Sequence, residues 1–134
     1  MKRRSPDGLT ARPLVLIVDG HDDTRALYSL ALTGMGFDVL ASRDSDDAYG
    51  RASAVHPDII VTELMLSAGD GWDLLGRLKS DARTRDIPVA VLTGQCAPSH
   101  RERASRDGCA AFLAKPCLPD ELAMEIHHVL ARVH

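Results

Sequence analysis

Five short apolar runs alternate with segments of helical periodicity along the chain, and this alternation narrows the possible folds. The runs are Leu14–Val18, Phe37–Ala41, Ile59–Val61, Pro88–Leu92 and Ala110–Ala114. Most of them have about five residues, a usual strand length. Leu14–Val18 is apolar without interruption, as expected of a strand that is covered on both faces. The pattern predicts five short strands, each followed by a helix.

The segments between the runs predict the helices. Asp22 or Asp23 can cap the first one, and Gly34-Met35-Gly36 ends it. Its expected inner face consists of apolar residues at helical spacing: Leu27, Leu30 and Ala31. Three further helices are expected over 44–55, 70–80 and 98–107, the last of these polar and charged. The fifth has apolar residues at the clearest helical spacing: Leu122, Ile126, Val129, Leu130 and Val133.

Four chemically active side chains come directly after, or at the end of, the expected strands. Alternating strands and helices imply a parallel sheet with helices on both faces. In such sheets the functional site lies beyond the carboxyl ends of the strands. The residues at those ends are Asp19, Glu63, Thr93 and Lys115. Two carboxylates, a hydroxyl and an ammonium are therefore expected to converge.

Composition excludes several classes of protein. The chain has 134 residues, 45% of them hydrophobic and 26% charged, with three cysteines. This length and composition fit one globular domain and not a disulfide scaffold or a disordered chain, and no apolar run could cross a membrane. The formal net charge is −3. Residues 1–12 carry +3 of charge and are expected to be a flexible basic leader, which leaves −6 on residues 13–134 and disfavours binding of nucleic acid.

The motifs at the strand ends resemble a two-component response-regulator receiver domain. The resemblance rests on Asp19, the segment 57–66, Asp70-Gly71, Thr93 and Lys115-Pro116, and it runs from about Leu14 to the C-terminus. It implies an α/β, flavodoxin-like (βα)5 fold, a doubly wound parallel sheet of strand order 2-1-3-4-5 forming a single domain over residues 13–134. Separately, three cysteines at unequal spacing favour a reducing, cytoplasmic location.

The resemblance assigns roles to individual positions. In the family, an aspartate after the third strand accepts a phosphoryl group from a histidine kinase, and acids after the first strand hold Mg²⁺. By position, Glu63 stands at the phosphoacceptor, Thr93 and Lys115 contact phosphoryl oxygens, and Phe112 is the aromatic that changes rotamer. The main-chain carbonyl of Met65 would be a further metal ligand.

Two positions depart from the family pattern. Glu63 replaces the acceptor aspartate, and Gly20 replaces the second acid, so that only Asp19 remains of the acidic pair. Loss of one anionic ligand weakens a Mg²⁺ site, so that no cofactor is expected beyond a weak or vestigial metal at Asp19, Glu63 and the Met65 carbonyl. The extra methylene of Glu63 spoils in-line geometry. We therefore expect ordinary phosphoryl transfer to be lost or very weak.

The consequence of Glu63 for signalling stays open at this stage. Its carboxylate can reach toward Lys115 and Thr93 and partly imitate an aspartyl phosphate, which would hold the domain near its active state. The domain can equally be fixed in an inactive or neutral state, or be regulated by something else. Asp22 and Asp23 are better explained as first-helix residues than as replacements for the lost acid, and His21 as a solvated loop residue.

No catalytic activity is expected of this chain. The acidic loop 19–23 would repel a cofactor phosphate, and no Ser-His-Asp, Walker or paired-cysteine zinc pattern occurs. We expect a degenerate, stand-alone receiver, or a piece of a longer protein, that acts by protein–protein contact. The alternative is a receiver that still accepts phosphate with Asp19, Glu63 and Lys115.

The expected partners are a histidine kinase or an output protein, and a weak homodimer is possible. In the family such contacts commonly use the fourth helix, fifth strand and fifth helix, a face that here includes Arg101, Phe112, Leu118 and His127. Arg101, Arg103 and Arg106 form a basic stripe on the fourth helix, either as a solvated face or as a partner surface.

Overall fold

The computed structural model describes residues 12–66 and 70–133, which form five strands and five helices in strict alternation. The strands are β1 (Leu14–Val18), β2 (Asp38–Ser42), β3 (Ile59–Thr62), β4 (Val89–Thr93) and β5 (Ala111–Ala114). The helices are α1 (Asp22–Gly34), α2 (Ser45–Val55), α3 (Gly71–Ser80), α4 (Pro98–Arg106) and α5 (Pro119–Val133). Each predicted element is present, with bounds that differ by one or two residues at some ends.

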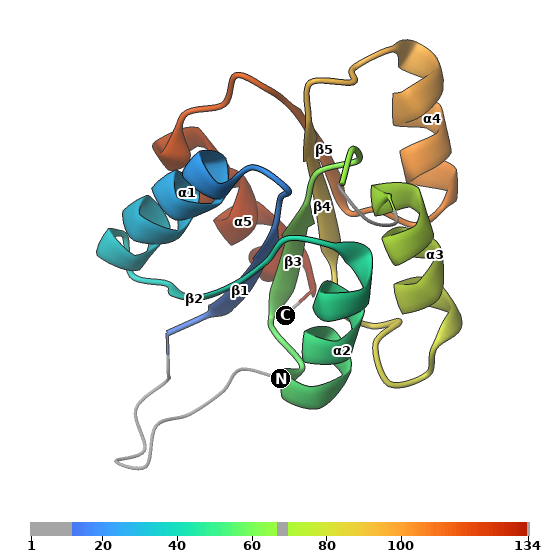
Figure 1. Ribbon diagram of the computed structural model, residues 1–134, viewed down its shortest axis with the longest axis horizontal. Coiled ribbons are helices and arrows are strands. Elements are labelled where there is room, and N and C mark those ends of the chain that lie inside the picture. Colours follow the sequence, from blue (N-terminus) through green and yellow to red (C-terminus); the bar gives the residue numbers. More distant parts are fainter. Residues whose placement is uncertain (1–11, 67–69, 134) are drawn as a thin grey trace.

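The strands form one parallel sheet in the order β2-β1-β3-β4-β5, as the resemblance implied. Helices α1 and α5 cover one face of the sheet, and α2, α3 and α4 lie on the other side (Figure 1). Because all strands run in one direction, their carboxyl ends meet at one edge. That edge carries the four side chains singled out in the sequence.

Two hydrophobic cores flank the sheet. Strand residues alternate between the two faces. One core joins the sheet to α1 and α5 through residues that include Tyr28, Leu32 and Ile126. The other joins the sheet to α2 and α3 through residues that include Leu75 and Leu78. The central strands β1, β3 and β4 are buried over their whole length, which explains their uninterrupted apolar sequences.

The inner face predicted for α1 is wrong. Leu27 and Leu30 are 57% and 77% exposed, whereas Tyr28 and Leu32 are buried. The Tyr28 hydroxyl donates a hydrogen bond to the Cys117 carbonyl at 2.6 Å, which satisfies its polar end while the ring packs inward. With Tyr28 inside, Leu32 at i+4 shares the buried face. The leucines at i−1 and i+2 then turn toward solvent.

Side-chain caps begin two of the helices. Asp44 and Asp70 accept hydrogen bonds from Asp47 N–H and Asp73 N–H, so each caps its helix as N-cap residues do. The cap predicted for α1 is wrong, because His21 is the N-cap residue and Asp22 and Asp23 lie inside the first turn. There the two carboxylates favour the positive end of the helix dipole.

The expected leader 1–12 falls outside the described residues except for Arg12. The Arg12 guanidinium donates hydrogen bonds to the carbonyls of Thr33 and Phe37, near the end of α1. Residue 12 is thus attached to the fold. None of the described helices combines the length and the apolar character needed to span a membrane.

Candidate functional site

Lys115 joins the two carboxylates that follow β1 and β3. Its Nζ atom lies 2.8 Å from Asp19 Oδ2 and 2.8 Å from Glu63 Oε2. Asp19 and Glu63 are both buried, and the Lys115 side chain is 23% exposed. We call these three residues the acid–lysine cluster. They come from three separate strand ends, so the cluster forms only in the folded sheet.

The Glu63 carboxylate folds back onto the chain that follows it. Its Oε1 atom accepts hydrogen bonds from Leu64 N–H at 2.7 Å and from Met65 N–H at 3.4 Å. Its Oε2 atom faces Lys115. Both oxygens of the predicted acceptor position are therefore engaged within the protein. The extra methylene of glutamate gives the side chain the length for this turn.

Asp19 is held in a similar way. Its Oδ1 atom accepts a hydrogen bond from His21 N–H at 2.9 Å, and its Oδ2 atom faces Lys115. The His21 ring lies 3.5 Å from the same Oδ1 atom and is largely exposed. Arg25 donates to the Asp19 carbonyl at 2.8 Å. With these bonds, all four carboxylate oxygens of the acid–lysine cluster have partners.

The charge of Lys115 depends on its two partners. Burial of the ammonium opposes its charged form, but hydrogen bonds to Asp19 and Glu63, together with their negative charges, outweigh this effect. The net result is a pKa for Lys115 that is raised above its ordinary value of 10.5. Lys115 is therefore firmly charged at neutral pH. The cluster carries a formal charge of −1 when both carboxylates are ionised.

Gly71 allows the backbone around Glu63 to come close to α3. Its N–H donates to the Leu64 carbonyl at 2.8 Å. A Cβ atom at position 71 would lie 2.3 Å from the Glu63 carbonyl oxygen and 2.8 Å from Leu64 Cα. The Asp70-Gly71 motif thus has a local cause: Asp70 caps α3, and Gly71 makes room for the chain that carries the two amide donors.

Thr93 and Phe112 lie at the same end of the sheet but outside the acid–lysine cluster. Thr93 is fully buried, and its hydroxyl accepts a hydrogen bond from Gln95 N–H at 3.0 Å. The sequence left open whether Glu63 would reach Thr93. Within residues 12–66 and 70–133, no hydrogen bond links the Thr93 hydroxyl to Glu63. Phe112 is half-buried and packs toward Leu64 and α4.

The donor set fits Mg²⁺ poorly. Mg²⁺ requires several oxygen ligands in near-octahedral geometry. Gly20 offers no side-chain oxygen, and Asp22 pairs with Arg25 at 2.6 Å instead of replacing the missing acid. The described residues hold no group of three or more acidic, histidine or cysteine side chains placed for a metal. The Lys115 ammonium already lies between the two carboxylates, and it would repel a cation there.

The sequence revealed which side chains meet, and it missed their backbone partners. The amides of Leu64 and Met65 and the amide of His21 complete the acid–lysine cluster. Backbone groups leave no residue-type signal, so no pattern could have identified them. The position of each amide, one or two residues after an acid at a strand end, was the only available hint.

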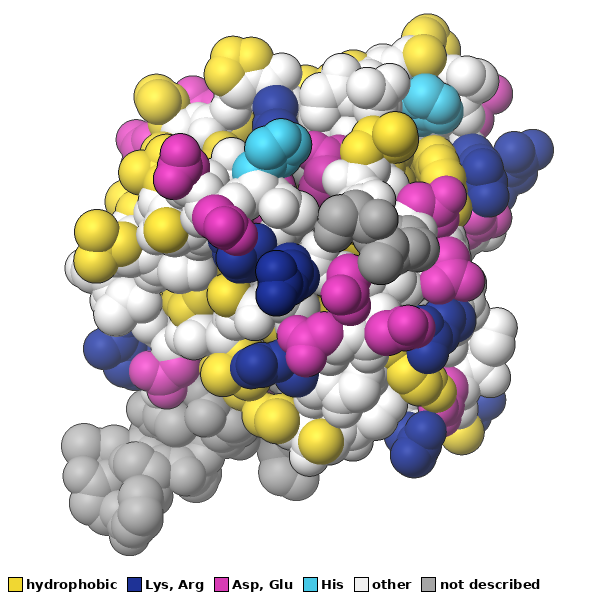
Figure 2. All heavy atoms as spheres, viewed as in Figure 1, with side chains coloured by type: hydrophobic (Ala, Val, Ile, Leu, Met, Phe, Trp, Pro, Cys, Tyr) yellow, Lys and Arg dark blue, Asp and Glu magenta, His cyan; other side chains and the backbone are white. Residues whose placement is uncertain are grey.

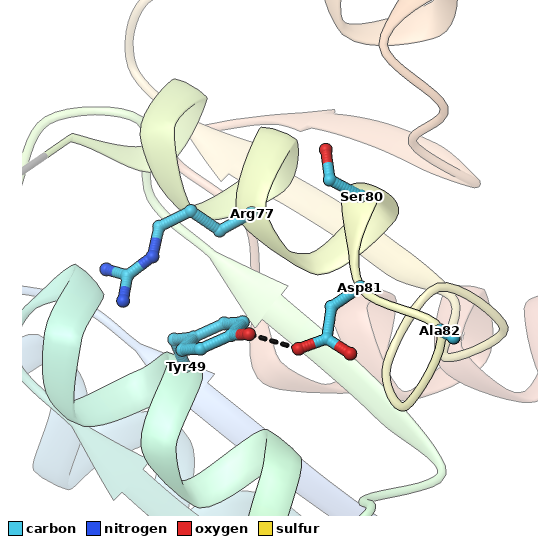
Figure 3. A pocket seen from close by; sticks show the side chains of 5 residues that line it. All are labelled: Tyr49, Arg77, Ser80, Asp81 and Ala82. Atoms are coloured by element: carbon cyan, nitrogen blue, oxygen red, sulfur yellow. Dashed lines mark hydrogen bonds between the residues drawn. The ribbon is translucent and has the colours of Figure 1, made fainter.

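A hollow lies between α2 and the end of α3 (Figure 3). The Tyr49 hydroxyl points at Asp81 and donates a hydrogen bond to its carboxylate. The Arg77 guanidinium lies 4.3 Å from the centre of the Tyr49 ring. Arg83 also pairs with Asp81, at 2.8 Å. These groups satisfy one another and connect α2 to α3, so we assign the hollow a structural role.

Comparison with known proteins agrees with the fold. Residues 15–127 match the family model described as "Response regulator receiver domain". The phosphate regulon transcriptional regulatory protein PhoB of Klebsiella pneumoniae is 32% identical over 119 residues, which cover 89% of this chain and 52% of PhoB. The chain therefore spans about half the length of this curated relative.

Solved structures give the same result. A putative response regulator from Chloroflexus aurantiacus superposes with a TM-score of 0.84 at 29% identity, covering 90% of this chain and 99% of that one. A response regulator from Desulfuromonas acetoxidans superposes with a TM-score of 0.83 at 29% identity, covering 91% and 99%.

Proposed function

Since this chain belongs to the response-regulator receiver family, we propose that it is a signalling module that is not phosphorylated at the usual position and acts through contact with other proteins. One observation carries the proposal. The carboxylate at the acceptor position, Glu63, is bound to two backbone amides and to Lys115. An acceptor must present a free oxygen to the incoming phosphorus atom, and here both oxygens would first have to leave charge-assisted hydrogen bonds.

The rest of the acid–lysine cluster supports this proposal. Phosphoryl transfer depends on positioning and on neutralisation of negative charge. Gly20 removes an acid from the expected metal site, and Lys115 offsets one of the two negative charges of the remaining carboxylates. Lys115 therefore serves as the counter-charge inside the protein. In this proposal the acid–lysine cluster keeps a single arrangement of its side chains without phosphate or metal.

Glu63 brings less charge than a phosphoryl group would. A glutamate has one negative charge and two oxygens, whereas a phosphoryl group has nearly two charges and three acceptor oxygens. The position of Thr93 agrees with incomplete imitation of a phosphoryl group, because the Thr93 hydroxyl accepts a hydrogen bond from Gln95 N–H and makes none with Glu63. We therefore favour a fixed, neutral resting state over a permanently active-like one. The module is not an enzyme in this proposal, and it operates in the cytoplasm as a unit that begins near residue 13.

The surface of α4, β5 and α5 is the proposed contact face for a histidine kinase or an output protein. Arg101 and Leu118 are exposed on it, and Phe112 is half-buried. His127, which was expected on this face, instead stacks on Phe37, just before β2, with 4.9 Å between the ring centres. Leu118 leaves 61% of its surface uncovered, so its side chain is available to a partner. Contact on this face would bury Leu118 and transmit the state of the module.

The test is the mass of the intact protein after incubation with acetyl phosphate and Mg²⁺. The wild type is expected to gain no phosphoryl group. The double variant Glu63→Asp with Gly20→Asp restores a shorter acceptor and a second acid, and is expected to gain one. Its control is the same double variant with Asp19→Asn, which again lacks an acid. A phosphoryl group on wild-type Glu63 would overturn the proposal in favour of a conventional phosphate-accepting receiver.

A further inference from the structure

Two arginines of α4 lie over aromatic rings from neighbouring elements. Arg103 Cζ is 4.2 Å from the centre of the Trp72 ring of α3. Arg101 Cζ is 4.8 Å from the centre of the Phe112 ring of β5. Both distances fall in the range of cation–π contacts. We call these four residues the arginine–aromatic patch.

The patch lies on a helix that contributes little to the core. Ala104 is the one buried residue among Pro98–Arg106. Arg101 and Arg103 are exposed, whereas Trp72 and Phe112 are half-buried, so each ring packs partly against the core and is also covered by an arginine. Dark-blue side chains gather beside a histidine and hydrophobic side chains over α4, at the upper right of Figure 2. The outer surface of α4 is thus open to a partner.

The charge of the patch is opposite to that of its surroundings. Helix α4 contains Arg101, Arg103 and Arg106 against one acid, Glu102. The chain as a whole has a net charge of −3. A local positive surface on a negative domain attracts a negative partner and repels like-charged ones.

The guanidinium groups retain hydrogen-bonding capacity. Among the residues that the structure describes, the Arg101 guanidinium makes no hydrogen bond or ion pair, and the Arg103 guanidinium has one 3.5 Å contact with Asp107. A guanidinium has five N–H donors arranged to bind carboxylates in pairs. The ring beneath each arginine restricts its side chain, which lowers the entropy lost when a partner is bound. Arginines that were only solvated would lack this ordering.

We propose that the arginine–aromatic patch is a docking surface for an acidic segment of a partner protein. Carboxylates of the segment bind Arg101 and Arg103, and an apolar side chain of the segment packs against the edges of Trp72 and Phe112. The inference rests on the proposed function in one respect, namely that the module signals by contact. It adds the chemistry of the partner, and it extends the contact face from α4 and β5 onto α3.

Trp72 makes the test specific to this surface, because it is the one tryptophan of the chain. Its fluorescence is measured while a synthetic glutamate peptide with a central leucine is added to the full chain. We expect a saturable change whose midpoint moves to higher peptide concentration as salt is added. A lysine peptide of equal length and a single-stranded RNA are added in parallel. An equal or larger response to either of these would overturn the proposal.

Charge reversal identifies the residues involved. Arg101→Glu leaves Trp72 and its arginine in place, and is expected to weaken peptide binding at least tenfold. The matched control is Arg51→Glu, which reverses an arginine of α2 that pairs with Asp47 at 3.1 Å on a different surface. The control is expected to bind like the wild type. Equal binding by wild type and Arg101→Glu, or no saturable fluorescence change, would contradict the proposal.

The outcome is independent of the phosphorylation test. Peptide binding is read from Trp72, whereas the state of Glu63 is read from intact mass. A phosphorylated wild type with normal peptide binding would remove the proposed function and leave the docking surface. An unmodified wild type that binds no peptide would leave the proposed function and remove the docking surface.

Discussion

Lys115 determines the charge balance of the site. It is the one cation in contact with the buried carboxylates of Asp19 and Glu63 within the part of the chain that the structure describes. Removing one member of a buried ionic group costs far more than removing an exposed pair, because it leaves uncompensated charge in a poorly solvated place. The lysine is therefore a structural requirement of this pair of acids as well as a candidate functional group.

We predict that Lys115→Met lowers the free energy of unfolding by about 3 kcal/mol, because two buried carboxylates then face each other without a cation. Urea denaturation at neutral pH measures this loss. The matched control is Arg51→Met, which breaks an exposed pair with Asp47 and should cost under about 1 kcal/mol. Equal losses in the two variants would mean that the acid–lysine cluster contributes no more than a surface ion pair.

The meeting of Asp19, Glu63 and Lys115 was predictable, and the direction of the Glu63 side chain was not. A parallel sheet brings strand ends together, so residue positions alone fix the neighbourhood. The glutamate has one more rotatable bond than an aspartate and can extend outward or fold back. Two backbone amides and Lys115 select the folded-back form. That selection depends on the three-dimensional path of the chain after β3.

At the scale of elements, the approach of α3 to β3 depends on the absence of a side chain at position 71. We predict that Gly71→Ala destabilises the protein by about 2 kcal/mol, because the new Cβ atom would collide with the Glu63 carbonyl. Gly76→Ala in the same helix is the matched control. Position 76 has open space, so alanine should stabilise the helix by up to about 1 kcal/mol. Thermal unfolding of both variants measures these changes. A Gly71→Ala variant as stable as the wild type would contradict the close approach of α3 to β3.

Helix α1 illustrates where periodicity alone fails. Its leucines suggested one inner face, but Tyr28 is amphipathic and could be assigned inward only once its hydrogen bond to Cys117 was known. We predict that Leu32→Ala costs about 3 kcal/mol, whereas Leu30→Ala changes stability by less than about 0.5 kcal/mol. Chemical denaturation of the two variants tests the assignment. A larger loss of stability for Leu30→Ala than for Leu32→Ala would favour the inner face that was predicted from the sequence.

For the whole molecule, the fold followed from the sequence because its signals agree with one another. Uninterrupted apolar runs indicated covered strands, and β1, β3 and β4 are buried. The helices expected over 44–55 and 70–80 are present as α2 and α3. The contacts of Arg103 with Trp72 and of Arg101 with Phe112 were not predictable, because each joins elements whose relative placement depends on the finished packing.

The charge balance of the acid–lysine cluster predicts that Mg²⁺ does not stabilise the wild-type protein. The Lys115 ammonium lies between the two carboxylates and offsets one of their two negative charges, so adding Mg²⁺ should leave the thermal unfolding temperature of the wild type unchanged. A ligand that binds the folded state would raise it. The Glu63→Asp, Gly20→Asp double variant supplies another acid and should be stabilised by Mg²⁺. Stabilisation of the wild type by Mg²⁺ but not by an equal ionic strength of NaCl would contradict this account.

The pH dependence of the lysines tests the central claim, that Lys115 is the bound counter-charge of Asp19 and Glu63. The chain has three lysines, Lys2, Lys79 and Lys115. Their side-chain resonances can therefore be assigned by substitution and followed by NMR from neutral to alkaline pH. Lys79 is an internal control, because burial lowers its pKa below 10.5.

Hydrogen bonds to the two carboxylates outweigh burial and raise the pKa of Lys115 above 10.5. The stability that the cluster contributes is then complete below pH 10.5 and is lost as pH rises through the higher folded-state value. We predict that Lys115 titrates at higher pH than Lys79 in the wild type and at lower pH in Glu63→Gln than in the wild type. A Lys115 that titrates at or below 10.5 in the wild type, unaffected by Glu63→Gln, would contradict the claim.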